Sequence, residues 1–156
     1  MAEPEIVQVQ EKKLVGKKIR MSLIENKAGI LWQSFMPGRK EIQNNLGNEL
    51  ISMQVYEDLP RMGDINQSFD KWAAVEVSDF ESIPDGMESF ILKSGKYAVF
   101  HYKGLSTDNS IFIYIFTVWL PSSGYQLDNR PHFEVLGERY KNNDPNSEEE
   151  IWIPIK

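Results

Sequence analysis

Two stretches of the sequence carry the same apolar spacing 83 residues apart, and this repetition limits the possible folds more than any other feature. In each stretch, apolar side chains recur at positions i, i+3, i+4, i+7 and i+8, which is the period of one face of an α-helix. The first set is Ala28, Leu31, Trp32, Phe35 and Met36, and the second is Ile111, Tyr114, Ile115, Val118 and Trp119. The sequence therefore predicts two amphipathic helices with matching patterns.

Extended segments surround both predicted helices in the same order. Residues 6–23 and 97–103 have strand character before the helices, with Gly16 at a bulge or a close backbone approach. Two more strands are predicted after each helix, at 50–56 and 71–77 in the first half and at 132–140 and 149–155 in the second. The order strand, helix, strand, strand thus occurs twice.

The helix boundaries correspond as well. Asn26 in the first half and Asp108 or Asn109 in the second can cap the helices, and Pro37 and Pro121 come where the helices are expected to end. A single apolar stripe is generic, because any amphipathic helix shows one. The shared order of strand, cap, helix, proline and strand pair is what indicates a duplication.

A chain of 156 residues fits one domain, here residues 1–156. The predicted fold is α+β, with tandem duplicated β-α-β-β units at about 6–78 and 93–156 and a turn-rich linker at 79–92. Each half has one helix. We therefore expect the two helices on one face of antiparallel sheets and a concave groove on the other face.

The C-terminal strand has two contrasting faces. Side chains alternate between the faces of a strand, so the isoleucines at 151, 153 and 155 share one face, while Glu150, Trp152 and Pro154 share the other. The isoleucines need a core. A carboxylate beside a tryptophan is either an exposed residue at the mouth of the strand or part of a cavity wall.

Correspondence between the halves favours the cavity. Aligning 73–77 with 151–155 pairs Trp72 with Glu150, and similar spacing pairs Tyr56 with Tyr140. A cleft between like halves that is rich in rings, with a few polar groups, is the usual form of a small-molecule site. A carboxylate buried among rings must take up a proton or find a cation, and aromatic faces attract cations too. The sequence therefore predicts a site for flat or bulky organic cations.

Composition and motifs exclude several other classes. The net charge is −6 and Lys and Arg are scattered, so we expect no direct nucleic-acid binding. The chain has no cysteine, no secretory signal pattern and no apolar run of roughly 18 residues, so no membrane association is expected and the predicted location is the cytoplasm. Phosphate loops and hydrolase signatures are absent, and His101 and His132 lack a metal-ligand neighbourhood. We predict neither a metal nor a cofactor.

Five phrases of the sequence together resemble the GyrI-like small-molecule binding proteins, a family that includes effector-binding domains of AraC-type and MerR-type transcription regulators. They are IPDGM at 83–87, GKYAVF at 95–100, WLPSSGY at 119–125, RPHFE at 130–134 and EIWIPI at 150–155. The resemblance covers about residues 6–155. It implies a tandem β-α-β-β fold with a concave pocket lined by rings, in which a glutamate at the position of Glu150 binds cationic drugs. No helix-turn-helix segment precedes the resembling region, so a DNA-binding regulator of the usual two-domain kind is not expected.

The expected function is to bind or sequester amphipathic aromatic cations in a pocket between the two halves. The candidate ligand-binding residues are Glu150, Trp72, Tyr140, Trp152, Tyr56 and Trp119. Two alternatives follow from the resemblance to standalone family members. One is a metal-independent hydrolase of strained cyclopropane rings, with Glu150 as general base and Tyr140 or Tyr56 as hydrogen-bond donor. The other is an inhibitor that binds gyrase, and a regulator is a further possible protein partner.

Overall fold

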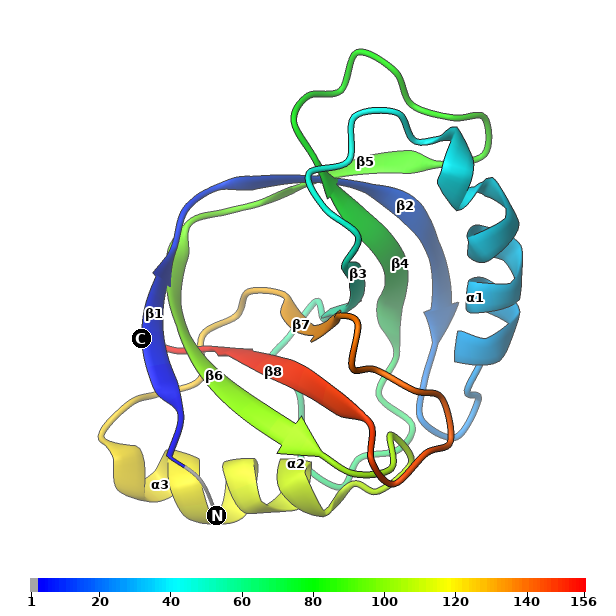
Figure 1. Cartoon of the computed structure of the whole chain (residues 1–156). Coiled ribbons are helices and arrows are strands. Elements are labelled where there is room, and N and C mark those ends of the chain that lie inside the picture. The colour runs from blue at the N-terminus through cyan, green and yellow to red at the C-terminus, as the bar shows by residue number, and fades with distance from the viewer. Residues whose placement is uncertain (1–2) are drawn as a thin grey trace.

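The computed structural model of the protein describes residues 3–156. Within that range, eight strands form one antiparallel sheet in the order β1-β6-β8-β7-β3-β4-β2-β5. The strands are β1 (Glu5–Val9), β2 (Lys12–Met21), β3 (Leu50–Val55), β4 (Phe69–Val77), β5 (Glu88–Leu92), β6 (Gly95–Lys103), β7 (His132–Leu136) and β8 (Glu148–Pro154). The sheet curls strongly, and the helices lie outside the curl (Figure 1). The predicted α+β class is confirmed.

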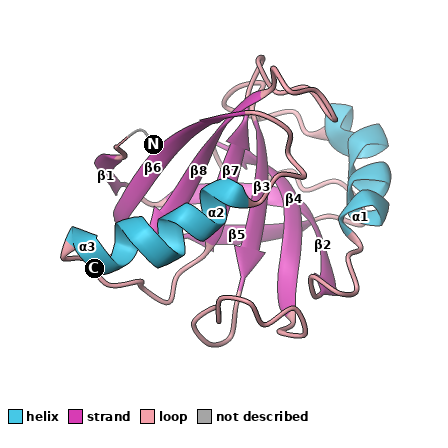
Figure 2. Ribbon diagram, turned by 90° about the horizontal axis from the view of Figure 1, so that it is seen from below, coloured by secondary structure: helices cyan, strands magenta, loops and turns pink. Residues whose placement is uncertain are grey.

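Both helical regions cover the convex face of the sheet (Figure 2). The first consists of helix α1 (Ala28–Phe35) and the 3-10 turn η1 (Met36–Glu41), and α1 packs on β2 and β4. The second runs through α2 (Ser110–Tyr114), a π-helical segment η2 (Ile115–Trp119) and α3 (Leu120–Ser123). Leu31 and Phe35 pack against Val75 in one core, and Ile115 packs with Ile151 in the other. The prediction that the helices share one face is confirmed.

The sequence predicted where the helices start, but not every residue of the predicted apolar stripes is buried. Asn26 accepts a hydrogen bond from the backbone N–H of Ala28 at 2.9 Å, and Asp108 accepts one from Ser110 at 2.9 Å. Met36 and Val118 are exposed, contrary to prediction. At Met36 the α-helix changes to a 3-10 turn. At Val118 the π-helical segment has shifted the angular phase of the side chains.

Each half contains one strand more than predicted. Chain extension is interrupted at residues 10–11 rather than at Gly16, and 88–92, assigned to the linker, form β5. The β1–β6 and β2–β5 ladders keep one continuous register, because Val9 pairs with Gly95 and Lys12 with Leu92. The β1–β2 segment and the β5–β6 segment thus act as two long, bent strands that pair with each other along their length. Through this pairing the two halves share one sheet.

Gly16 lies inside β2, where the backbones of two strands approach closely. A Cβ at this position would lie 2.7 Å from the Cα of Ala74 and would also collide with the carbonyl oxygen of Ala73. Contacts below 3.0 Å with backbone atoms cannot be relieved by rotating a side chain. The close approach that the sequence offered as one explanation for this glycine is therefore present.

Strand pairing places Trp72 and Glu150 at corresponding positions of the two halves. Trp72 lies between Lys18 and Met53, and Glu150 lies between His101 and Val135. Counting from these pairs makes Glu138 the counterpart of Tyr56, so the predicted match of Tyr56 with Tyr140 is wrong. Loops of different length follow β3 and β7, which shifts the alignment after those strands. Superposition of the whole halves remains a prediction.

Candidate functional site

The concave face of the sheet carries a cluster of aromatic rings. Tyr97 lies edge-on to Phe133 with ring centroids 5.2 Å apart, and Phe133 stacks on Trp152 at 5.2 Å with a 16° angle between planes. Trp72 packs against Phe90 at 5.3 Å on the same face. Alternation along β4, β5, β6, β7 and β8 brings these rings together, because every second residue of each strand points into the curl.

A small cavity, here called the aromatic pocket, adjoins this cluster. Its volume is about 140 Å³, and it is lined by Lys12, Leu46, Gly47, Glu49, Ile51, Glu76, Phe133, Val135, Glu150 and Trp152. Trp152 donates its indole N–H to the carboxylate of Glu150 at 3.3 Å. The side chain of Glu150 is 36% exposed, so it is partly withdrawn from water while remaining accessible. This combination of ring and carboxylate suits an organic cation.

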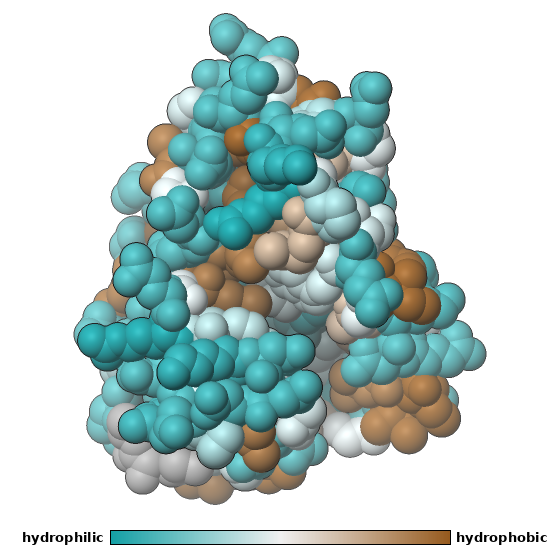
Figure 3. Space-filling model, turned by 45° about the vertical axis from the view of Figure 1, so that its right-hand side comes forward, coloured by the Kyte–Doolittle hydropathy of each residue, from teal (hydrophilic) through white to brown (hydrophobic). Residues whose placement is uncertain are grey.

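A larger cavity, the open recess, begins at the same carboxylate. Its volume is about 780 Å³, within the range of sites for drug-sized ligands. Glu150, Tyr140 and His101 contribute to its wall, as do Arg39 and Arg139. Charged residues therefore surround the recess, whereas the aromatic pocket combines the rings of Phe133 and Trp152 with charged side chains, among them Glu150. On the face drawn in Figure 3, a surface recess is bordered mainly by hydrophilic residues, with hydrophobic residues deeper inside.

Three of the predicted site residues, Glu150, Trp152 and Trp72, lie on the concave face, and Tyr140 lies in the loop after β7. Glu150 and Trp152 line the aromatic pocket, and Glu150 and Tyr140 line the open recess. Trp72 belongs to the aromatic core of this face but is only 3% exposed, and the ammonium of Lys18 lies 5.7 Å from its ring centroid. Trp72 lines neither cavity, so its contribution to the site is to support the wall.

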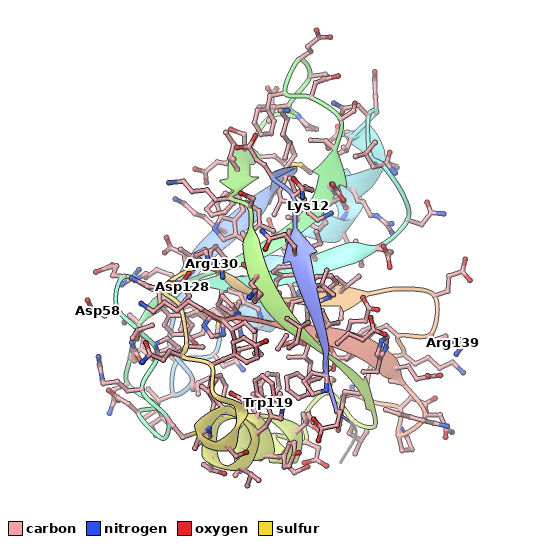
Figure 4. The ribbon with its side chains drawn as sticks, turned by 90° about the vertical axis from the view of Figure 1, so that its left-hand side faces the viewer. Lys12, Asp58, Trp119, Asp128, Arg130 and Arg139 are labelled. Carbon is pink, nitrogen blue, oxygen red and sulfur yellow. The ribbon has the colours of Figure 1, made fainter. Side chains whose placement is uncertain are left out.

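The other two predicted residues do not join the site. Tyr56 packs against Phe69 with ring centroids 4.9 Å apart, and burial raises the pKa of Tyr56 to about 12. Trp119 is the last residue of η2 and is buried between the second helical region and the sheet, edge-on to Phe100 at 5.2 Å (Figure 4). Tyr56 was assigned to the groove by its match with Tyr140, which the strand pairing does not support. Trp119 belongs to the apolar stripe of the second helical region, which packs on the convex side.

Sequence reasoning missed a charged cluster on the convex face, formed by Lys71, Glu134 and Glu149. Burial, reinforced by the neighbouring Glu134, raises the pKa of Glu149 to about 9. Burial lowers the pKa of Lys71, and the charges of Glu134 and Glu149 oppose this shift. Part of the signal was present, because Lys71 stands between Phe69 and Ala73 on an otherwise apolar face of β4. Glu149 likewise shares its face of β8 with the buried isoleucines. This cluster lies across the sheet from the aromatic pocket.

His132 is buried on the convex face between Tyr56 and Phe116, with ring centroids 5.8 and 6.2 Å away. Burial lowers its pKa to about 4, so the imidazole is neutral near pH 7. Among residues 3–156, no three His, Cys, Asp or Glu side chains are grouped so that they could hold a metal ion. No helix in this part of the chain is long and apolar enough to cross a membrane.

The sequence matches a known family over nearly its whole length. Residues 2–156 match the family described as GyrI-like small molecule binding domain. The transcriptional regulator BrlR of Pseudomonas aeruginosa is 30% identical over 144 residues, which cover 91% of this chain and 51% of BrlR. The chain thus spans about half the length of this curated relative.

Solved structures show the same fold at lower sequence identity. SAV2435 bound to tetraphenylphosphonium has a TM-score of 0.73 and 20% identity, over 99% of this chain and 94% of that one. The C-terminal domain of EcmrR has a TM-score of 0.70 and 15% identity, over 99% and 97%. A hydrolase from Listeria innocua has a TM-score of 0.62 and 12% identity, over 99% and 92%.

Proposed function

Because the chain belongs to the GyrI-like small-molecule binding domain family, we propose that it binds singly charged, amphipathic aromatic cations on the concave face of its sheet. The ligand's rings would lie against Trp152 and Phe133 in the aromatic pocket. Its positive charge would lie beside Glu150, and its bulk would extend into the open recess. Small-molecule binding itself is a property of the family.

The uncompensated charge of Glu150 is the observation that carries this proposal. Within residues 3–156, the only ion-pair partner of Glu150 is His101, whose Nε2 lies 3.8 Å from the carboxylate. Neither Lys nor Arg lies within 4.0 Å of Glu150 in that range. The Trp152 N–H is a neutral donor and leaves the negative charge in place. A ligand cation between the carboxylate and the ring face would gain from both.

The similar structure of SAV2435 supports the choice of ligand class, because it holds tetraphenylphosphonium, a cation enclosed by four phenyl rings. At 20% identity the likeness shows the fold alone, so the ligand class for this chain rests on its own residues. Trp152, Phe133 and Glu150 supply the chemistry that such a cation requires.

A paired titration tests the proposal. Tetraphenylphosphonium and tetraphenylborate have nearly the same size and shape but opposite charge. We expect the phosphonium to quench tryptophan fluorescence with saturation at one site, because Trp152 lines the pocket. The borate should bind far more weakly. Equal affinity for the two ions would rule out a site selected by the charge of Glu150.

A second candidate function is hydrolysis, favoured by the shared position of Glu150 and Tyr140 on the wall of the open recess. There the carboxylate could act as general base towards water and the phenol as hydrogen-bond donor. Incubation with a cyclopropane-bearing alkylating agent distinguishes the two functions. Turnover that Glu150→Gln abolishes, with cation binding unchanged in that variant, would favour the hydrolase. A role as a gyrase inhibitor remains a prediction.

A further inference from the structure

Lys12 brings a positive charge to the aromatic pocket. It is the first residue of β2, where the chain passes from β1 into β2 (Figure 4). Its side chain faces the concave side, as does Leu14 two residues later. The Lys12 ammonium lies 3.4 and 3.5 Å from the two carboxylate oxygens of Glu76. Both residues line the pocket together with Glu150.

The Lys12–Glu76 pair and Glu150 enter the pocket from different parts of the sheet. Lys12 lies on β2 and Glu76 on β4, and strands β3 and β7 separate β4 from β8, which carries Glu150. The Lys12 and Glu76 side chains are 32% and 33% exposed, and their separation exceeds that of a tight charge-assisted hydrogen bond. The pair is therefore weak, but it neutralises one of the carboxylates that line the pocket.

We propose that Lys12 restricts the aromatic pocket to singly charged cations. This inference rests on the proposed function, because it assumes that one ligand charge lies beside Glu150. Glu49, the third carboxylate of the lining, also lines the open recess together with Glu150, whereas Lys12 and Glu76 do not. On the side of the pocket away from the recess, a second positive charge on the ligand would therefore approach the Lys12 ammonium instead of a free carboxylate. Without Lys12, Glu76 would be available as a second counter-charge, and the site would accept a dication.

Ethidium and propidium provide the test, because they share a phenanthridinium ring system and propidium carries one additional quaternary ammonium. The wild-type protein should prefer ethidium. In Lys12→Met, propidium affinity should rise about three- to ten-fold more than ethidium affinity, as expected for removing one nearby like charge at a partly exposed site. Fluorescence titration measures both affinities directly.

Two variants control for other effects of the substitution. Lys13→Met removes the same charge from the adjacent residue, whose side chain faces the convex side with Val15. It should leave the preference unchanged. The double variant Lys12→Met with Glu76→Gln lacks both the ammonium and the freed carboxylate. It should recover the preference for ethidium, because Glu76 no longer offers a second counter-charge.

The outcomes separate this inference from the proposed function. An equal change for both dyes in Lys12→Met, or no change for either, would overturn the role of Lys12 while leaving cation binding intact. Ethidium binding that is absent from the wild-type protein, or unaffected by Glu150→Gln, would contradict the proposed function. The inference about Lys12 would then fail with it.

Discussion

Trp152 and Glu150, two residues apart on one face of β8, form a hydrogen bond of 3.3 Å from the indole Nε1 to the carboxylate Oε1. The bond joins the ring wall of the aromatic pocket to its negative charge. It is longer than the 2.7–2.9 Å typical of bonds between fully charged partners. The carboxylate is therefore oriented by Trp152 and keeps its capacity to pair with a cation.

Replacing Glu150 with Gln tests this charge while keeping the shape of the side chain. Tetraphenylphosphonium affinity should fall by about 10- to 100-fold, the loss of a charge-assisted contact worth roughly 1.5 to 3 kcal/mol. A neutral tetraphenyl compound such as tetraphenylsilane should bind equally well to both proteins. The free energy of unfolding should stay the same or rise, because the amide removes an uncompensated, partly buried charge. Calorimetric titration and chemical denaturation measure the two effects.

Glu148→Gln is the matched charge control for that substitution, and Glu149→Gln controls for the carboxyl group itself, because the raised pKa of Glu149 keeps it protonated near pH 7. Glu149 is buried on the opposite face of β8, and Glu148 pairs with Arg139 at 3.6 Å near the start of the strand. Glu148→Gln and Glu149→Gln should weaken cation binding much less than Glu150→Gln. A loss of the same size in either control would show that the charge of Glu150 is not the specific counter-charge.

Alanine substitution should have opposite effects on stability at two glycines. Gly16→Ala should lower the free energy of unfolding by about 2 kcal/mol or more, because the new methyl group would collide with the backbone of β4. Gly29 lies in α1, and a methyl group added there would point into open space, with no atom within 4 Å beyond the helix's own backbone. Gly29→Ala should raise stability by roughly 0.5 to 1 kcal/mol. Urea denaturation that shows equal effects at the two sites would contradict this account.

The sequence could predict which residues of β8 face the site, because side chains alternate along a strand. The isoleucines at 151, 153 and 155 are each 1% exposed, while Glu150 and Trp152 face the curl on the other side. A strand's period of two fixes these facings once the strand is identified. The correspondence of Trp72 with Glu150 also followed from local spacing. Each of these residues lies inside a strand, β4 or β8, in which no inserted residue interrupts the alternation of side chains.

Contacts between side chains on different strands could not be predicted from the local sequence pattern. Lys12 reaches the pocket because β2 pairs with β4, and nothing near Lys12 in the sequence indicates Glu76 as its partner. Tyr56 was assigned to the groove because it was matched with Tyr140, although alternation along β3, where Met53 and Val55 face the curl, places Tyr56 on the convex side. The exposure of Val118 depends on a π-helical segment that no apolar stripe can reveal.

The buried imidazole of His132 should weaken the fold in acid. Its pKa in the folded protein is about 4, below the ordinary value of 6.5, so between these values the unfolded chain binds a proton that the folded protein does not. Stability should therefore fall as the pH is lowered from 6.5 to 4, by at most about 1.4 kcal/mol per pH unit. His132→Gln and His132→Phe both lack this titration and should show a flatter acid limb. An unchanged slope in both variants would exclude His132 as its source.

Glu149 should give the opposite pH dependence, at higher pH. Its pKa is raised from 4.5 to about 9 in the folded protein, so between these values the folded protein holds a proton that the unfolded chain releases. The contribution of Glu149 is complete below pH 4.5 and is lost as the pH rises through about 9. Lys71, whose pKa is lowered, contributes with the opposite sign and offsets part of this loss.

Glu149→Gln isolates the carboxyl contribution, because the amide has similar shape and does not titrate. The free energy of unfolding of the variant relative to the wild-type protein should increase steadily from pH 5 to pH 9. Glu148→Gln changes the same charge at a partly exposed position and should show no comparable trend. Urea denaturation at several pH values provides the measurement. A difference between Glu149→Gln and the wild-type protein that is constant with pH would mean that Glu149 is already ionised in the folded protein.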